Sequence, residues 1–207
     1  MEVIVNAAVS LDGKLSSRRR EQIEISGPAD FDRVDRLREQ CDGILVGVGT
    51  VLADDPHLEA PGEAPTARVV ADSTGRTPLD ARILNDTAPT YLLVSTAIDA
   101  DRRAALAERG VTLITAGTER VDLSAALDAL SAEGIDRLLV EGGGELLFSL
   151  FEAELVDTVS VYIGPMLIGG RDAPTLADGE GFVESFPRAT LESVERLDEG
   201  VLLRWTL

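Results

Sequence analysis

The chain has 207 residues, of which 37 are acidic and 19 basic, so its formal net charge at pH 7 is −18. Nucleic acids and anionic membranes attract basic surfaces, so this charge argues against a nucleic-acid partner and against a membrane partner. The single cysteine and single histidine exclude an intramolecular disulfide and a Cys- or His-rich metal site, so we expect no metal.

Short apolar runs alternate with helical patterns through the first three quarters of the chain. We expect strands at 3–9, 44–48, 68–71, 91–94, 111–114 and 137–140, and helices at about 28–41, 100–109, 123–133 and 144–153. Near-continuous hydrophobicity in short runs is typical of strands that are covered on both faces. The alternation therefore predicts an α/β sandwich with a mostly parallel central sheet.

The last quarter has a different pattern. Strand-like runs at 156–163, 189–196 and 201–207 have no strong helix between the last two, and Asp198-Glu199-Gly200 is a turn signal. An antiparallel hairpin is therefore expected at one edge, preceded by a long loop at 164–188. We expect a single domain over 1–207 in the cytoplasm, because the first residues are too short and acidic for a signal peptide.

Two of the predicted strands run into glycine-rich turns. The first leads into Gly47-Val48-Gly49-Thr50, and the second into Gly142-Gly143-Gly144 ahead of an amphipathic helix. Glycines let a ligand approach the backbone, and a helix N-terminus favours phosphate. Neither turn is a GxGxxG fingerprint or a P-loop, so each is equally compatible with a plain tight turn. Asp54, which follows the first turn, either accepts a hydrogen bond from a ligand or caps a turn before Pro56.

A third stretch, Ser10-Leu11-Asp12-Gly13-Lys14, follows the first strand and carries the only lysine of the chain. The presence of the only lysine in this stretch suggests a specific role for Lys14. A plain turn at Asp12-Gly13 is the alternative explanation of the stretch. The basic cluster Arg18-Arg19-Arg20 is more typical of a solvated loop than of an anion site.

Together these stretches resemble the reductase family of riboflavin biosynthesis, which has a dihydrofolate-reductase-like fold. The similarity is greatest to stand-alone archaeal reductases that act on a diaminopyrimidinone ribosylamino 5′-phosphate. It extends over nearly the whole chain and is carried by Ser10–Lys14, Gly47–Pro56, Glu141–Glu145, Val161–Pro165, Gly169-Gly170, Ala173–Thr175 and Asp178–Phe182.

The resemblance implies an NAD(P)H-dependent oxidoreductase that converts the ribosylamino group to ribitylamino, with NADPH as the usual donor and NADH left open. It implies a homodimer with a phosphorylated pyrimidine as substrate. The implied cofactor-binding residues are Ala8, Thr50, Asp54, Asp72, Ser73, Thr74, Gly142, Gly143, Gly144 and Glu145. The implied substrate residues are Arg38, Leu58 and Glu141, with the guanidinium on the phosphate and the carboxylate on pyrimidine amino groups.

The chain departs from the family pattern in two places. Related bifunctional enzymes have Ser-x-Trp before the first helix, where this chain has Gln22-Ile23-Glu24. It also lacks the H-x-E and C-x-x-C residues of their zinc deaminase domain. No general acid is identified, and Asp54 is only a weak catalytic candidate.

Two alternatives stay open. The first is a reductase of the same fold that acts on another pyrimidine or a pteridine such as dihydrofolate. The second is a non-catalytic sensor that binds a nucleotide through the same glycine turns.

The acidic excess is spread along the whole chain, and 18 of the 19 basic residues are arginine. Strong screening by salt tolerates such self-repulsion, so we favour a halophilic protein. Because both expected ligands are anions, we expect positive groups and helix N-termini to gather locally at the active site, with Arg38 and the Gly142–Gly144 turn prominent, inside an acidic shell.

Overall fold

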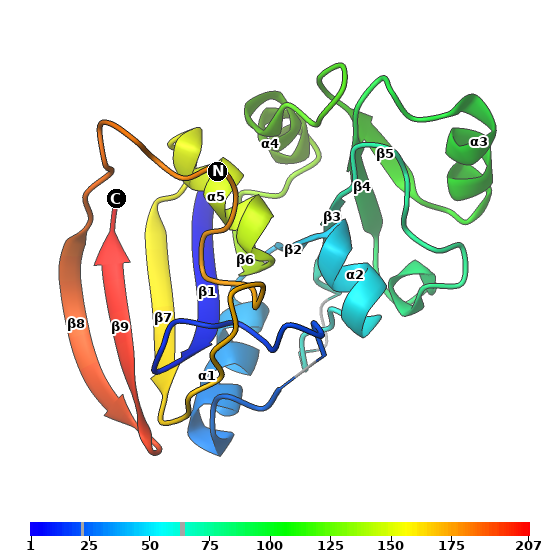
Figure 1. Cartoon of the computed structure of the whole chain (residues 1–207). Coiled ribbons are helices and arrows are strands. Elements are labelled where there is room, and N and C mark those ends of the chain that lie inside the picture. Colours follow the sequence, from blue (N-terminus) through cyan, green and yellow to red (C-terminus); the bar gives the residue numbers. More distant parts are fainter. Residues whose placement is uncertain (22, 63–64) are drawn as a thin grey trace.

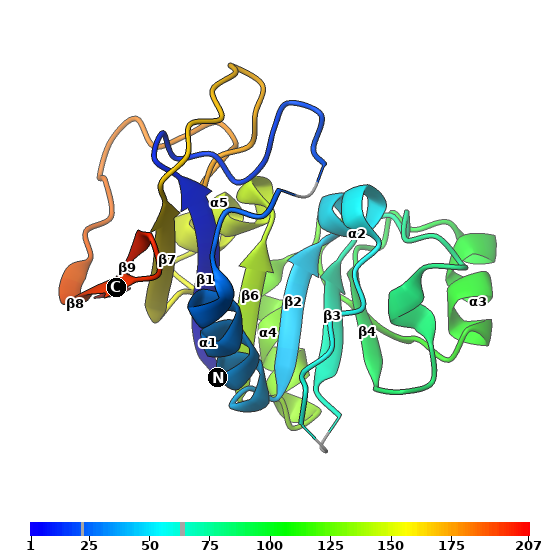
Figure 2. The same cartoon turned by 90° about the horizontal axis from the view of Figure 1, so that it is seen from below.

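The computed structural model describes residues 1–21, 23–62 and 65–207. Within these ranges the chain forms a nine-stranded sheet with helices on both faces (Figures 1 and 2). The strands are β1 (Glu2–Ser10), β2 (Gly43–Gly47), β3 (Ala67–Ala71), β4 (Thr90–Val94), β5 (Thr112–Thr115), β6 (Arg137–Gly142), β7 (Thr158–Gly164), β8 (Thr190–Leu197) and β9 (Gly200–Thr206). The helices are α1 (Pro28–Glu39), α2 (Val48–Asp54), α3 (Ala100–Glu108), α4 (Leu123–Ala132) and α5 (Gly144–Glu152), with a 3₁₀ turn at Arg82–Leu84.

The strand order is β5-β4-β3-β2-β6-β1-β7-β9-β8. From β5 to β7 every pair is parallel, whereas β9 runs antiparallel to both β7 and β8. The predicted fold class is therefore confirmed, including the hairpin at the C-terminal edge. None of the helices in the described ranges has the length and apolar character needed to cross a bilayer.

Two apolar cores cover the two faces of the sheet. Successive residues of β1 point to opposite faces, so Val5 belongs to one core and Ile4 to the other. The first core takes Leu127 and Leu130 from α4 and Leu147 and Leu150 from α5. The second core takes Leu37 from α1, Val51 from α2 and Leu106 from α3. Helices on both faces explain why the central strands are apolar throughout.

The apolar pattern of the sequence does not indicate one of the helices, α2. Val48 was expected to end a strand, but the structure makes it the first residue of α2, with Val48 and Val51 buried. A seven-residue helix with one buried turn has too few apolar positions to show a period. Gly164, the first residue of the predicted loop at 164–188, ends β7, and residues 165–188 contain no helix or strand apart from an isolated bridge between Lys14 and Thr175.

The turn after β3 is built around a buried carboxylate. Asp72 is fully buried. Its oxygens accept from the N–H of Arg76 at 2.8 Å, and from the N–H and hydroxyl of Thr77, each at 2.7 Å. The carboxylate of Asp72 is therefore occupied inside the turn, and the expected contact between Asp72 and a cofactor stays a prediction.

We predict that Asp72→Ala lowers the free energy of unfolding by about 2–3 kcal/mol, since it leaves buried donors without an acceptor. Urea denaturation at one fixed salt concentration measures the change. Asp80→Ala is the matched control, because Asp80 is an exposed acidic residue of the following loop. Equal stability of the two variants would contradict this role of Asp72.

Candidate functional site

A large cleft lies at the carboxyl ends of the central parallel strands and has a volume of about 1050 Å³. In open parallel sheets this edge is where ligands bind. The predicted site residues that line the cleft are Ala8, Arg38, Thr50, Asp54, Ser73, Thr74, Glu141, Gly142, Gly143, Gly144 and Glu145. Asp72 and Leu58 are buried and are not part of its lining. The structure thus brings together residues from five separate stretches of the chain.

The glycine turns leave backbone exposed to the cleft. A Cβ atom built on Gly49 or on Gly142 would meet nothing within 4 Å, so both positions face open space. The N-terminus of α5 begins directly after β6, and its N-cap residue, Gly143, supplies no capping side chain. Uncapped backbone N–H groups at a helix N-terminus bind phosphate well.

Gly144 is required for a different reason, which is close packing. A Cβ atom at this position would lie 2.4 Å from the carbonyl oxygen of Thr175. The N–H of Asp178 donates to the carbonyl of Gly144 at 3.0 Å, and the carboxylate of Asp178 in turn accepts from the N–H of Thr175 at 3.0 Å. Part of the long 164–188 loop therefore rests directly on the start of α5.

Arg38 and Glu141 form a bidentate ion pair across the cleft. Nε and Nη2 of Arg38 donate to the two carboxylate oxygens of Glu141 at 2.7 and 2.8 Å. Burial alone would lower the pKa of Arg38, but the hydrogen bonds and charge of Glu141 raise it above its ordinary value. Both groups were expected to bind substrate, and in this structure each is the other's partner.

The segment after α2 is held by a buried arginine that sequence reasoning did not identify. Arg68 is fully buried, and its Nη2 lies 3.0 Å from Oε1 of Glu59. The backbone carbonyl of Glu59 accepts from Arg38 at 3.4 Å. Leu58, which was expected at the substrate, precedes Glu59 and is buried in the second apolar core. It does not line the cleft.

The segment Ser10–Lys14 contacts the 164–188 loop through hydrogen bonds. The carboxylate of Asp12 accepts from the hydroxyl of Ser10 and from the N–H groups of Ile168 and Gly169, and these bonds lower its pKa to about 2. Lys14 donates from Nζ to the carbonyl of Ala173 at 3.2 Å. The only lysine therefore holds the loop after β1 against the 164–188 loop. Of the Gln22-Ile23-Glu24 segment, Gln22 lies outside the described residues.

Asp54 lies in the last turn of α2 and lines the cleft. Partial burial raises its pKa. Its carboxylate therefore carries a proton more readily than an exposed aspartate. Across residues 1–21, 23–62 and 65–207, no cluster of three His, Cys, Asp or Glu side chains could hold a metal ion.

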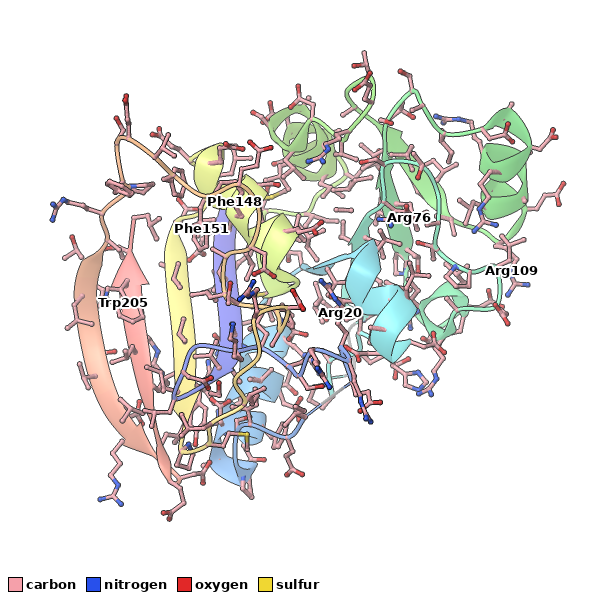
Figure 3. All side chains as sticks on the ribbon, viewed as in Figure 1. Arg20, Arg76, Arg109, Phe148, Phe151 and Trp205 are labelled. Carbon is pink, nitrogen blue, oxygen red and sulfur yellow. The ribbon has the colours of Figure 1, made fainter. Side chains whose placement is uncertain are left out.

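Positive charge is not in excess over the cleft as a whole, and the expected local gathering stays a prediction. The described lining of the cleft has four arginines, at 20, 38, 76 and 120, but six carboxylates, at 30, 35, 54, 141, 145 and 178. Several carboxylates are engaged, as Asp30 is with Arg33 at 2.8 Å. In the view of Figure 3, Arg76 and Arg20 lie apart, with Arg76 near β4 and Arg20 near α2. Positive charge is thus placed at particular points along the cleft.

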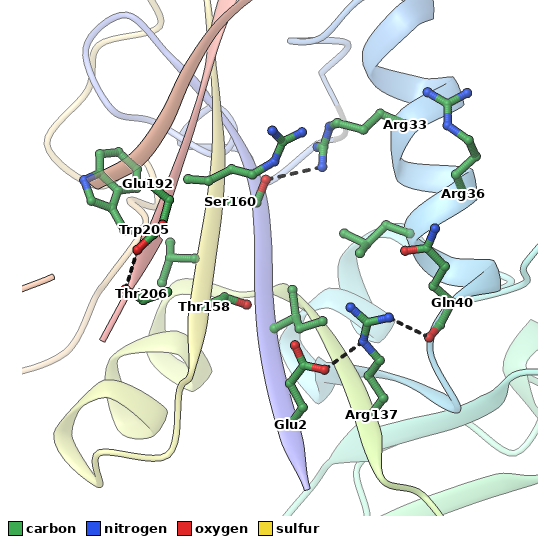
Figure 4. A pocket seen from close by; sticks show the side chains of 14 residues that line it. Glu2, Arg33, Arg36, Gln40, Arg137, Thr158, Ser160, Glu192, Trp205 and Thr206 are labelled. Carbon is green, nitrogen blue, oxygen red and sulfur yellow. Dashed lines mark hydrogen bonds and ion pairs between the residues drawn. The ribbon is translucent and has the colours of Figure 1, made fainter. Parts of the chain in front are cut away.

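A second cavity of about 380 Å³ lies between α1 and strands β1, β7 and β9 (Figure 4). It has several arginines, but most are paired: Arg137 with Glu2 at 2.9 Å, and Arg204 with Glu195 at 3.5 Å. None of the predicted site residues lines it. The large cleft is therefore the candidate functional site.

Comparison with known proteins gives a consistent result. A family model described as the RibD C-terminal domain matches residues 1–203. The chain is 46% identical over 210 residues to a protein of Archaeoglobus fulgidus named 2,5-diamino-6-ribosylamino-4(3H)-pyrimidinone 5′-phosphate reductase, covering 96% of this chain and 94% of that protein. It is also 46% identical to a protein of the same name from Methanothermobacter thermautotrophicus, covering 99% and 97%.

Solved structures show the same fold. A deaminase/reductase from Thermotoga maritima, described as a diaminohydroxyphosphoribosylaminopyrimidine deaminase/5-amino-6-(5-phosphoribosylamino)uracil reductase, superposes with a TM-score of 0.81 at 23% identity. The match covers 99% of this chain and 56% of that one, so the chain spans about half of that longer protein. RibD from Acinetobacter baumannii gives a TM-score of 0.79 at 25% identity, covering 99% of this chain and 57% of the other.

Proposed function

Because the chain belongs to the RibD C-terminal domain family, we propose that it is a reductase of riboflavin biosynthesis. Its substrate is 2,5-diamino-6-ribosylamino-4(3H)-pyrimidinone 5′-phosphate, the compound in the names of its archaeal relatives, and its product is the ribitylamino form. Residues 1–207 act as one reductase domain. The observation that carries the proposal is the cleft in which the Arg38–Glu141 pair and the glycine turn after β6 meet.

The roles of the two charged groups follow from their chemistry. Glu141 can accept hydrogen bonds only, which suits the amino groups of a diaminopyrimidine. Arg38 presents a planar fork that fits a phosphate with two parallel bonds. In the present structure they satisfy each other, so substrate binding exchanges one bidentate ion pair for two ligand contacts. A ligand that offers only one of these partners leaves the other group buried without its counter-charge.

Reductases of this family take a nicotinamide cofactor. The described residues fit such a group, because Gly49 and Gly142 leave open space on the cleft wall and α5 offers uncapped N–H groups. We propose NADPH as the donor, with its pyrophosphate at Gly142–Glu145 and its nicotinamide ring near Ala8, Thr50 and Asp54.

When bound, the reduced nicotinamide supplies a hydride from C4 to C1′ of the ring-opened sugar imine. The chain's own residues align the two reactants and exclude water. The 164–188 loop, fastened by Asp12, Lys14 and Gly144, closes the cleft from one side. The imine nitrogen also needs a proton, and Asp54 is the carboxyl group in the cleft whose pKa is raised.

We predict that the purified protein oxidises NADPH with this substrate and not with dihydrofolate. Arg38→Ala should lower kcat/KM by about 10- to 100-fold, because charge-assisted hydrogen bonds contribute about 1.5–3 kcal/mol. Arg36→Ala is the control, since Arg36 is an exposed arginine of the same helix that does not line the cleft. The decrease in the absorbance of reduced nicotinamide over time measures the rate of NADPH oxidation.

The same assay distinguishes the alternatives. Reduction of dihydrofolate would favour another pterin or pyrimidine reductase of this fold. Binding of NADPH without turnover of any substrate would favour a nucleotide sensor. Asp54→Ala with unaltered turnover and cofactor affinity would remove Asp54 from the site.

We also propose a homodimer formed through the C-terminal hairpin. Leu191 and Val194 of β8 are 52% and 62% exposed, and they pair with Trp205 and Leu203 of β9. Directly paired residues lie on the same face of a sheet, so these four side chains form one apolar surface. A second copy of this surface would cover it.

The predicted outcome is a dimer in light scattering at micromolar concentrations. Charging the surface with the pair Leu191→Glu and Val194→Glu should give a monomer, because two buried carboxylates would oppose association. Val183→Glu is the control, as Val183 is an 86% exposed apolar residue of the 164–188 loop. A monomeric starting protein, or a double variant that stays dimeric, would refute this interface.

We further propose that the enzyme works in a salt-rich cytoplasm. The net charge of −18 opposes compaction, and screening by salt relieves this repulsion. The free energy of unfolding and the activity should both rise between about 0.1 and about 2 M KCl, where the Debye length falls from ~10 Å to under 3 Å. Highest activity in dilute buffer, declining as KCl is added, would refute the halophilic interpretation.

A further inference from the structure

A buried asparagine of β1 lines the cleft beside the residues proposed for the substrate, and no role above uses it. Asn6 is only 7% exposed and is part of the lining of the cleft. Strands β1 and β6 pair in parallel, and Asn6 and Glu141 each follow the last paired position of their strand. Helix α1 contacts both side chains. Arg33 donates to Asn6 at 2.7 Å, and Arg38 donates to Glu141 at the same distance.

Arg33 determines which way the side-chain amide of Asn6 points. A guanidinium group can only donate hydrogen bonds, so the amide must present its oxygen to Arg33. Nη2 of Arg33 accordingly lies 2.7 Å from Oδ1 of Asn6, and the amide NH2 lies on the other branch of the side chain. Among the described residues no group accepts a hydrogen bond from this NH2, which is not sealed from solvent. A donor is therefore left for a ligand in the cleft.

The guanidinium of Arg33 is itself held in place. Its Nε lies 2.8 Å from the carboxylate of Asp30, which is almost fully buried. Its Nη1 donates to the hydroxyl of Ser160 at 3.3 Å (Figure 4). Arg33 cannot swing away from Asn6 without leaving the charge of Asp30 buried and unpaired, which is costly. The amide is thus oriented before any ligand binds, and a preorganised group loses less entropy on binding.

Asn6 and Glu141 present opposite hydrogen-bonding character to the cleft. Glu141 can only accept, whereas the free branch of Asn6 can only donate. The compound in the names of the archaeal relatives has the matching pattern, with an amino group at C2 and an oxo group at C4. These two substituents flank the same ring nitrogen, so one edge of the ring can meet both side chains.

We propose that Asn6 donates from Nδ2 to the 4-oxo group of the pyrimidinone and is a specificity-determining residue of the reductase. Asp30 and Arg33 are positioning residues that orient its amide. The proposal rests on the function proposed above, since it requires the ring to lie against Glu141. A ring with an amino group at C4 would bring two donors together in a largely buried place and leave both without an acceptor. Sites built on a hydrogen bond reject such ligands strongly.

The isosteric substitution Asn6→Asp separates this role from a structural one. It keeps an oxygen for Arg33 and replaces the outward NH2 by a second carboxylate oxygen, which repels the oxo group. The value of kcat/KM for the pyrimidine substrate should fall by about 10- to 100-fold, mainly through KM, while KM for NADPH stays unchanged. Asn6→Ala should lose about tenfold, so that the isosteric variant is the poorer enzyme.

Asn85→Asp is the matched control. Asn85 is the only other asparagine of the chain, is exposed and does not line the cleft, so the variant has the same added charge at a distant place. The loss in Asn6→Asp should also persist at about 2 M KCl, where the Debye length is under 3 Å, because a direct contact is screened much less than a long-range field.

Equilibrium binding tests the same contact without turnover. The probes are the ribitylamino product and its analogue with an amino group at C4. The unaltered protein should bind the product about tenfold or more tightly than the analogue, and Asn6→Ala should lower this ratio by about tenfold. This measurement needs no Asn6→Asp protein, so it decides the proposal even where thermal unfolding shows that variant to be unfolded.

Full activity of a folded Asn6→Asp variant would overturn the proposal, because Asn6 would then serve only as a partner of Arg33. A loss that disappears at high salt, an equal rise in KM for NADPH, or a binding ratio unchanged in Asn6→Ala would do the same. Failure of the proposed function looks different, since the unaltered protein then does not reduce the substrate with NADPH or NADH. Failure of the Asn6 contact alone leaves reduction intact in the unaltered protein and in the variants.

Discussion

Parallel pairing of the strands from β5 to β7 determines where every other part of the molecule lies. Parallel strands need crossover connections, so helices must cover both faces and the strands must be apolar on both sides. The same pairing brings the carboxyl ends of β1, β2, β3 and β6 to one edge, where each must turn into a loop or helix. Glycines at two of these turns leave backbone N–H groups open to the cleft. The site is thus a consequence of the pairing, shaped by a few residues at the strand ends.

The Arg38–Glu141 ion pair lies in the cleft at the ends of these strands. It joins α1 to the end of β6 across the cleft, and both side chains are largely buried, at 27% and 12% exposure. In this state each group occupies the hydrogen-bonding positions of the other. A ligand must therefore supply both an anion and hydrogen-bond donors to repay the separation of the two charges. Under the roles proposed for Arg38 and Glu141, selectivity for a phosphorylated aminopyrimidine would follow from that double requirement.

The strands, the long helices and the hairpin could be predicted because their apolar periods and turn residues are local signals. The glycine turns at strand ends could be placed from the sequence itself, whereas most of the candidate cleft residues, such as Ala8, Arg38 and Glu141, were named only through the family resemblance. The sequence does not show which side chains are buried in the fold or which partners they contact there. Asp72 and Leu58 follow recognisable motifs but are buried, and nothing local indicates that Arg68 would be buried beside Glu59. Arg120 lies 44 residues after Arg76, and only the fold brings their segments together.

The scarcity of lysine has a practical consequence. Lys14 is the only side-chain amine of the chain, and its Nζ lies against the carbonyl of Ala173, where the loop after β1 meets the 164–188 loop. Apart from the N-terminus, an amine-selective reagent can therefore attach at this one place. A side-chain label on Lys14 would therefore lie at the junction of the two loops without any engineered residue. A label at this position would report on the contact between these two loops in the unaltered chain.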